Sequence, residues 1–229
     1  MGSNKWLKIV LKPGNYERSA ETIEQILEAA LKVLVNDGYA ALTFRRVEQE
    51  SGLKVEHISY HFPTKEDLVR GLLDAVMAGY SDRSDRLVTA TEGGDRAQFR
   101  AAIVTILRDI QTFETTHLFP ELWSMANHDP VVNDSVQEFY RRARVRMIAL
   151  LRRLNPALSE TDAETLCIFY SSFVEGSTIF AGYGKPYADR MSDIAAIAIH
   201  TFIDIAEKIT PEQMHSLRDE WSPPAAAAE

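Results

Sequence analysis

The sequence predicts an all-α protein, with a small N-terminal domain of three helices followed by a larger helical body. Apolar residues recur at three- and four-residue spacing along most of the 229 residues, which is the period of an amphipathic helix. Two short helical patterns flank Gly52, and Thr or Ser stands before several apolar runs at the position of a helix cap. These three observations favour a chain built from helices.

The composition narrows the class of protein. Hydrophobic residues make up 45% of the chain and charged residues 25%, which is ordinary for a globular protein. Cys167 is the only cysteine, so no internal disulfide is possible, which suits a reducing compartment. No apolar run reaches the length of a membrane span, and Lys8 interrupts the short apolar run from Trp6 to Leu11. We therefore expect a cytoplasmic protein without a membrane partner.

The net charge of −8 is unevenly distributed. Residues 1–70 carry ten Lys or Arg and ten Asp or Glu, so the acidic excess lies in residues 71–229. Local basic groups matter more than total charge for contact with phosphates. The N-terminal part therefore remains open to a nucleic-acid partner, with modest nonspecific affinity expected.

The first predicted helix runs from about Ala20 to Asn36. Asn36-Asp37-Gly38 ends it, and its apolar stripe consists of Ile23, Ile26, Leu27, Ala30 and Leu34. Residues 1–18 form a segment with several basic residues around a Pro13-Gly14 break. Two interpretations of this segment are open: a basic arm that contacts DNA, or a loosely packed tail.

A helix-turn-helix pattern follows the first helix. The spacing predicts one short helix over residues 44–51, with Thr43 as its cap, and a second over residues 55–62. Gly52 between them suits a left-handed turn. Thr64-Lys65-Glu66-Asp67 has the Thr-x-x-acid pattern that opens a third helix, over residues 65 to about 80. In such a motif the second short helix enters the DNA major groove.

This stretch resembles the TetR family of bacterial transcriptional regulators. The matching positions are Thr43, Val47, Gly52-Leu53, His61-Phe62, Lys65-Glu66 and Leu68. The motif covers about residues 19–73, and the rest of the chain matches only in its helical architecture. The resemblance implies a helix-turn-helix DNA-binding domain over residues 19–70 and a helical effector-binding and dimerisation domain over 71–220. The composition of the two ends predicts an N-terminal arm over 1–18 and a flexible tail over 221–229.

The resemblance also implies which side chains meet a double-stranded DNA operator. The expected contacts are Thr43, Arg45, Lys54, Val55, Glu56, His57, Ser59, Tyr60, His61 and Lys65. Those expected to face the major groove are Val55, Glu56, His57 and Tyr60. Those expected to contact phosphates are Thr43, Arg45, Ser59, His61 and Lys65. The sequence departs from the usual family pattern at Glu48, Lys54, Glu56 and Ser59.

Two of these residues have a specific chemical role. Glu56 can accept a hydrogen bond from cytosine N4, although its carboxylate meets the negative field of the phosphates. Lys65, in the first turn of its helix, can present both its backbone N–H and its ammonium to one phosphate.

The body is predicted to be helical throughout, after a linker at Glu92-Gly93-Gly94-Asp95. Apolar stripes mark helices around residues 99–113, 118–127 and 132–154, and Ser159 caps the next one. Residues 163–181 and 193–209 are apolar on nearly every side, so we expect both helices to be buried all round. In TetR-like proteins such helices form the homodimer interface, and DNA recognition also favours twofold symmetry. The alternative is a pair of central core helices.

TetR-like regulators usually bind a small effector in the helical body, and the effector favours one of two conformations. The candidates are aromatic side chains for an apolar pocket and two arginines for a carboxylate: Phe113, Phe119, Trp123, Phe139, Arg142, Arg146, Tyr170 and Phe173. The alternative interpretation is that the aromatic residues belong to the core and the arginines to a solvated face.

A metal-dependent helical enzyme is the alternative function. The pairs Glu114/His117 and Glu212/His215 both have the Glu-x-x-His spacing of di-iron bundles. That site needs two more inward glutamates, and His215 lies in a polar stretch. We therefore expect no metal, no cofactor and no enzymatic activity. The sequence hypothesis is a homodimeric DNA-binding regulator, a repressor that a small molecule releases from its operator.

Overall fold

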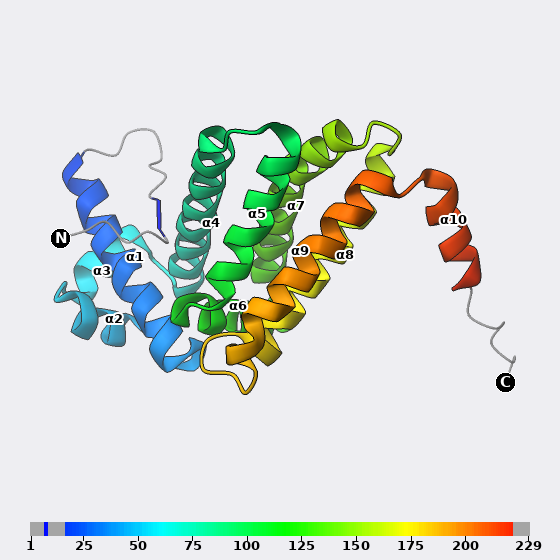
Figure 1. Cartoon of the computed structure of the whole chain (residues 1–229). Coiled ribbons are helices and arrows are strands. Elements are labelled where there is room, and N and C mark those ends of the chain that lie inside the picture. Colours follow the sequence, from blue (N-terminus) through cyan, green and yellow to red (C-terminus); the bar gives the residue numbers. More distant parts are fainter. Residues whose placement is uncertain (1–6, 9–16, 222–229) are drawn as a thin grey trace, which may run out of the picture. The chain divides into compact units, whose positions relative to one another are not determined.

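The computed structural model describes residues 7–8 and 17–221 (Figure 1). Every regular element in these residues is a helix, which confirms the predicted all-α class. In chain order the elements are α1 (Glu17–Asp37), η1 (Tyr39–Ala41), α2 (Phe44–Ser51), α3 (Val55–His61), α4 (Lys65–Ala90), α5 (Gly94–Ile110), α6 (Phe113–Ala126), α7 (Pro130–Leu154), α8 (Glu160–Ala181), η2 (Ala188–Arg190), α9 (Met191–Lys208) and α10 (Pro211–Glu220).

The chain divides into two compact units. Unit 1 comprises residues 1–90 and 111–143, and unit 2 comprises residues 91–110 and 144–229. Helix α4 runs without a break through the position where we placed the domain boundary, and α7 contributes residues to both units. The domain ranges 19–70 and 71–220 stay predictions.

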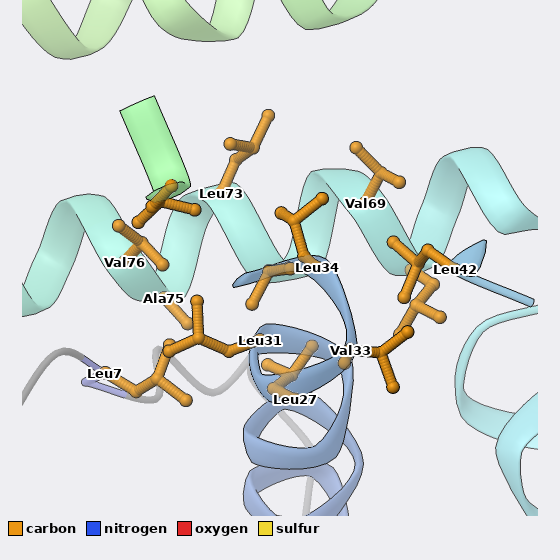
Figure 2. Packing of buried hydrophobic residues seen from close by; sticks show 14 of the residues in the cluster. Leu7, Leu27, Leu31, Val33, Leu34, Leu42, Val69, Leu73, Ala75 and Val76 are labelled. Carbon is orange, nitrogen blue, oxygen red and sulfur yellow. The ribbon is translucent and has the colours of Figure 1, made fainter. Parts of the chain in front are cut away.

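Unit 1 is built around α1, which packs against α2, α4 and α6. The apolar stripe predicted for this helix supplies its buried side chains: Ile26 and Ala30 have no exposed surface, and Leu27 and Leu34 almost none. Figure 2 shows the side chains that α1 and α4 contribute to this core, including Leu31, Leu34, Val69 and Leu73. Val47 of α2 and Ile58 of α3 belong to the same core, so this core holds both short helices in place.

One short piece of the N-terminal segment also packs on unit 1. Leu7 is buried in the core, and the backbone N–H of Lys8 donates to the carbonyl of Ala75 on α4 at 2.9 Å (Figure 2). The Lys8 ammonium lies 2.5 Å from a carboxylate oxygen of Asp82, also on α4. Most of the predicted arm, and the predicted tail after Trp221, lie outside the described residues.

Unit 2 is a packed group of α5, α8 and α9 with the second part of α7. Phe99 of α5 and Leu151 of α7 are fully buried, and Tyr170 of α8 packs against Phe202 of α9 with ring centroids 4.4 Å apart. The Tyr170 hydroxyl donates to the Phe202 carbonyl at 3.1 Å, and burial raises the pKa of this phenol. Tyr170 is therefore a core residue of this unit.

Several helix boundaries differ from those predicted. Helix α4 continues to Ala90, ten residues beyond the predicted end. Helix α6 begins at Phe113, because the Thr112 hydroxyl caps it by accepting from the Thr115 N–H at 3.3 Å; Pro120 then lies inside the helix. Residues 211–220 form α10, a helix that the sequence pattern does not predict and that begins with a capping box between Thr210 and Gln213.

In the single chain, α8 and α9 are not buried on all sides, so the predicted burial requires a partner. Large apolar side chains remain exposed on them: Ile168, Phe169, Ile179, Phe180 and Ile197. On α8, Ile168 and Ile179 are eleven positions apart, as are Phe169 and Phe180. Eleven residues make about three helical turns, so these side chains lie along one side of that helix. An apolar face of this extent normally meets a partner. Separately, none of the helices in the described residues is long and apolar enough to cross a membrane.

Candidate nucleic-acid interface

Helices α2 and α3 form the predicted helix-turn-helix. The Thr43 hydroxyl caps α2 by accepting a hydrogen bond from the Arg46 N–H at 3.2 Å. Gly52 ends the helix with φ of 74°, in the left-handed region that side chains disfavour, and its N–H donates to the Glu48 carbonyl at 2.8 Å. Both predicted boundary residues are therefore confirmed in their local roles.

The inner sides of these two short helices are anchored by apolar side chains. Val47 of α2 and Ile58 of α3 have no exposed surface, and Phe62 directly after α3 is 8% exposed. Phe62 also lies over α4, since a Cβ placed on Gly71 would come within 2.6 Å of its ring. Large side chains at positions 47, 58 and 62 thus fix which face of α3 points outward.

The outward face of α3 is polar and carries three of the predicted groove residues. Glu56 and His57 are exposed, and Tyr60, one turn later, is 83% exposed. The spacing of these residues places them on one side of the helix, opposite Ile58. The fourth groove residue, Val55, is half-buried, so the structure leaves less of it available.

The phosphate candidates on α3 are less exposed than the groove candidates. Ser59 is half-buried and its hydroxyl donates to the Glu56 carbonyl at 3.2 Å. His61 is half-buried with its ring 5.1 Å from that of Tyr60, edge to face. Burial, with a smaller effect of His57, lowers the pKa of His61, so its neutral form is favoured near neutral pH.

Charged residues on α2 divide into two kinds. Arg46 is ion-paired within the fold: its guanidinium lies 2.9 Å from Asp37 and 3.2 Å from Glu50. Arg45 is exposed, and so is Gln49 one turn later. The four-residue spacing of Gln49 from Arg45 places both on the same side of α2.

The two remaining basic candidates lie at helix starts. Lys54 precedes α3; it is 75% exposed in its side chain, and its ammonium lies 3.5 Å from Glu48. Lys65 begins α4, is half-buried, and donates from its ammonium to the Tyr39 carbonyl at 3.2 Å. The same ammonium lies 3.8 Å from the centre of the Tyr39 ring, and burial lowers the pKa of Lys65.

Comparison with known proteins identifies this arrangement. A sequence model described as "Bacterial regulatory proteins, tetR family" matches residues 26–72, and one described as "BetI-type transcriptional repressor, C-terminal" matches residues 95–204. The first match spans the core of α1, the helix-turn-helix and the start of α4. The chain belongs to the TetR family. It is a DNA-binding transcriptional regulator.

Individual relatives agree with the family. An HTH-type transcriptional regulator encoded in the dhlA 5' region of Xanthobacter autotrophicus is 25% identical over 90% of this chain and 96% of its own length. A TetR-family regulator from Mesorhizobium loti has the same fold, with a TM-score of 0.68 at 13% identity, over 83% of this chain and 98% of its own. A regulator from Saccharomonospora viridis, solved in complex with choline, has a TM-score of 0.65 at 20% identity, over 79% and 96%.

The residues that we predicted for an effector of this TetR-family regulator are divided between the two units. Phe119, Trp123 and Phe139 lie in unit 1, where they join two tyrosines that we did not predict, Tyr80 and Tyr140. Neighbouring ring centroids in this aromatic cluster are 5.2 to 6.2 Å apart. The Trp123 indole N–H donates to the Tyr140 hydroxyl at 2.9 Å.

The other effector candidates have different surroundings. Phe113 stacks on His117 in unit 1 with ring centres 4.0 Å apart, and Phe173 packs edge to face on Phe202 in unit 2. Arg142 is paired with Glu138 at 2.6 Å. Arg146 is exposed on α7. A separate hollow on unit 2 contains none of the eight candidates and is lined by Val145, Ile148, Ala149, Arg152, Arg153, Pro156 and Glu160.

Nothing in the described residues favours the metal-enzyme alternative. The His117 ring nitrogen Nδ1 is 2.7 Å from the Phe113 carbonyl of its own helix. Glu138, a possible further glutamate of such a site, is held by Arg141 and Arg142, whose hydrogen bonds lower its pKa to about 2. Glu212 and His215 are exposed on α10. Across residues 7–8 and 17–221, no three His, Cys, Asp or Glu side chains gather closely enough to hold an ion.

Proposed function

We propose that this TetR-family regulator is a repressor that places α3 in the major groove of a double-stranded DNA operator and is released by a small-molecule effector. The observation that carries the proposal is the division of α3 into a buried inner side and an exposed polar side. Its inner side is fixed by Ile58, while Glu56, His57 and Tyr60 point outward. A short helix held rigidly with a polar outer face is what direct reading of base edges requires.

The ten predicted contacts take two roles in this proposal. Base reading falls to Glu56, His57 and Tyr60, with Val55 as a smaller apolar contact. Phosphate contacts fall to Thr43, Arg45, Lys54, Ser59, His61 and Lys65. The exposure of Arg45, against the ion-paired state of Arg46, supports Arg45 as the phosphate contact of α2.

We further propose that two copies associate through α8 and α9, the helices predicted over residues 163–181 and 193–209. Family membership implies a dimer, and the exposed apolar side chains Phe169, Phe180 and Ile197 support these helices as its interface. Covering such side chains stabilises association by about 25 cal/mol per Å² of apolar surface removed from water. A twofold dimer also matches a palindromic operator.

The effector is proposed to act at the aromatic cluster of unit 1. Phe119, Trp123 and Phe139 come from two helices, α6 and α7, and their rings would make an apolar wall. Aromatic faces also attract organic cations, and one fold neighbour was solved with choline. Choline and related quaternary ammonium compounds are therefore the first probes to test.

A salt-series gel shift tests the DNA-binding part. The purified protein is titrated against the DNA upstream of its own coding region, with excess generic competitor. Saturable binding that survives the competitor and weakens as salt rises supports the proposal. Binding that the competitor abolishes would contradict a specific operator in that DNA, and selection from a random duplex library would then decide whether any sequence is preferred.

Fluorescence of Trp123 tests the effector part. A compound that binds the aromatic cluster should change the emission of the wild-type protein and not that of Trp123→Phe. The same compound should lower operator affinity. A compound that lowers operator affinity while leaving Trp123 emission unchanged would place the effector elsewhere.

A further inference from the structure

Glu121 of α6 contacts the turn that joins α1 to the helix-turn-helix. Its carboxylate oxygen Oε2 accepts a hydrogen bond from the Tyr39 N–H at 3.0 Å, across 82 residues of sequence. The turn itself is constrained, because Gly38 has φ of 81° and ψ of 171°, a conformation that is essentially restricted to glycine. A Cβ at Gly38 would lie 3.5 Å from Oε1 of Glu121, so the carboxylate lies closely against this turn.

Tyr39 is held from its other side by Lys65. The Tyr39 carbonyl accepts from the Lys65 ammonium at 3.2 Å, and the Tyr39 ring lies under the same ammonium at 3.8 Å. The amide of one residue therefore binds α6, and its carbonyl and ring bind the first residue of α4. All three residues belong to unit 1.

We propose that Glu121 is a positioning residue for DNA binding. It does not touch DNA. By fixing the Tyr39 amide, Glu121 fixes the carbonyl and ring that hold the Lys65 ammonium at the start of α4. This inference rests on the proposed phosphate contact of Lys65.

The geometry gives Glu121 this role because it provides an acceptor for an otherwise unpaired amide. The backbone hydrogen bonds of the turn leave this amide out: Gly38 N–H donates to the Leu34 carbonyl, Ala41 N–H to the Gly38 carbonyl and Leu42 N–H to the Tyr39 carbonyl. Without the carboxylate, the Tyr39 N–H loses its partner and the turn can rotate to find water. Lys65 then has more orientations available, and it must give them up when it binds a phosphate.

The test measures DNA affinity of Glu121→Met, which keeps the size of the side chain and removes the acceptor, beside Glu121→Gln, which keeps an acceptor oxygen. Glu114→Gln removes a carboxylate elsewhere on α6 and is the matched control. The DNA is the operator or generic duplex at low salt, since a phosphate contact acts on any sequence. Glu121→Ala serves as a second variant, and circular dichroism checks that each protein is folded.

Glu121→Met should weaken DNA binding by about 3- to 10-fold, the range that one hydrogen bond commonly contributes. Glu121→Gln should stay within about 2-fold of wild type, and Glu114→Gln should bind as wild type does. In a Lys65→Ala background, Glu121→Met should have no further effect, because the group that it positions is absent. Equal weakening in both backgrounds would mean a general structural role and would overturn the proposal.

The failures of the two proposals are distinguishable. If Lys65→Ala weakens DNA binding and Glu121→Met does not, the positioning role alone is wrong. If Lys65→Ala binds DNA as the wild type does, the phosphate contact of Lys65 is wrong and the positioning role falls with it.

Discussion

The exposed surface of α3 in unit 1 and that of α8 and α9 in unit 2 differ in kind. On α3 the exposed residues are Glu56, His57 and Tyr60, and all carry polar groups. On α8 and α9 they include Phe180 at 61% exposure and Ile197 at 68%. A polar helix face is stable in water and can exchange its hydration for base edges and phosphates. An apolar face gains free energy only when another apolar surface covers it.

This difference teaches that exposure alone does not mark one kind of site. Helix α3 exposes hydrogen-bonding groups, whereas α8 and α9 also expose hydrocarbon side chains. The first kind suits a charged polymer and the second suits another copy of the chain. Substitutions that place a charge on the apolar face, or that remove charged and polar groups from α2 and α3, test which partner each surface binds.

The largest expected effect comes from placing a charge on the apolar face. Ile197→Glu should cost the dimer about 3 kcal/mol or more, because a carboxylate without a partner would be buried in the contact. Light scattering should then find monomers at concentrations where the wild type is dimeric, and operator affinity should fall more than about 100-fold.

The control for this change is Val131→Glu, which alters an exposed apolar residue at the start of α7 in unit 1. It should leave the assembly unchanged. An Ile197→Glu protein that remains dimeric would remove this part of α9 from the interface.

The next effect concerns the carboxylate on the DNA-facing side. Glu56→Ala should change base preference at one operator position by about 1–3 kcal/mol, because it removes an acceptor that distinguishes base pairs. Its affinity for generic DNA should rise, since a negative charge facing the phosphates is lost. Binding to a library randomised at each operator position measures both quantities. An unchanged preference would assign base reading to other residues of α3.

Two adjacent arginines on α2 provide a matched pair with a smaller effect. Arg45→Ala should weaken binding to all sequences alike and reduce the slope of log affinity against log salt by about one. Arg46→Ala should instead lower stability, because Arg46 is held by Asp37 and Glu50 in the fold. Anisotropy titrations over a salt series and thermal unfolding separate these outcomes. If Arg45→Ala lowered stability and Arg46→Ala weakened DNA binding instead, Arg46 would be the phosphate contact and Arg45 the structural residue.

The smallest expected effect lies at the start of α2. Thr43→Ala should lower the free energy of unfolding by about 1 kcal/mol, because the hydroxyl that accepts from Arg46 N–H is lost. Thr43→Ser should restore most of it. Urea unfolding gives these values. If Thr43→Ser regains stability but not DNA affinity, the threonine methyl contributes to the DNA contact; if neither variant changes DNA affinity, Thr43 is a cap only.

The sequence predicted best what is decided within a few residues. The Thr43 cap, the left-handed Gly52 and the capping box of Ser159 and Asp162 each depend on hydrogen bonds or backbone angles spanning at most four positions. The outward face of α3 came from the family resemblance, and three of its four implied groove residues, Glu56, His57 and Tyr60, are exposed. It failed at the start of α6, where Thr112 caps the helix ahead of Pro120.

By itself, then, the sequence determined the all-α class and the helix-turn-helix, since caps, glycines and apolar period are local properties of the chain, and its motif residues indicated the family. Only the tertiary structure decided which faces stay open and which distant residues meet. Phe169 and Phe180 have the same apolar character as the core residue Tyr170, and packing alone separates them. Glu121 reaches Tyr39 across 82 residues, and helical period gives the direction of a side chain but not the neighbour that it will contact.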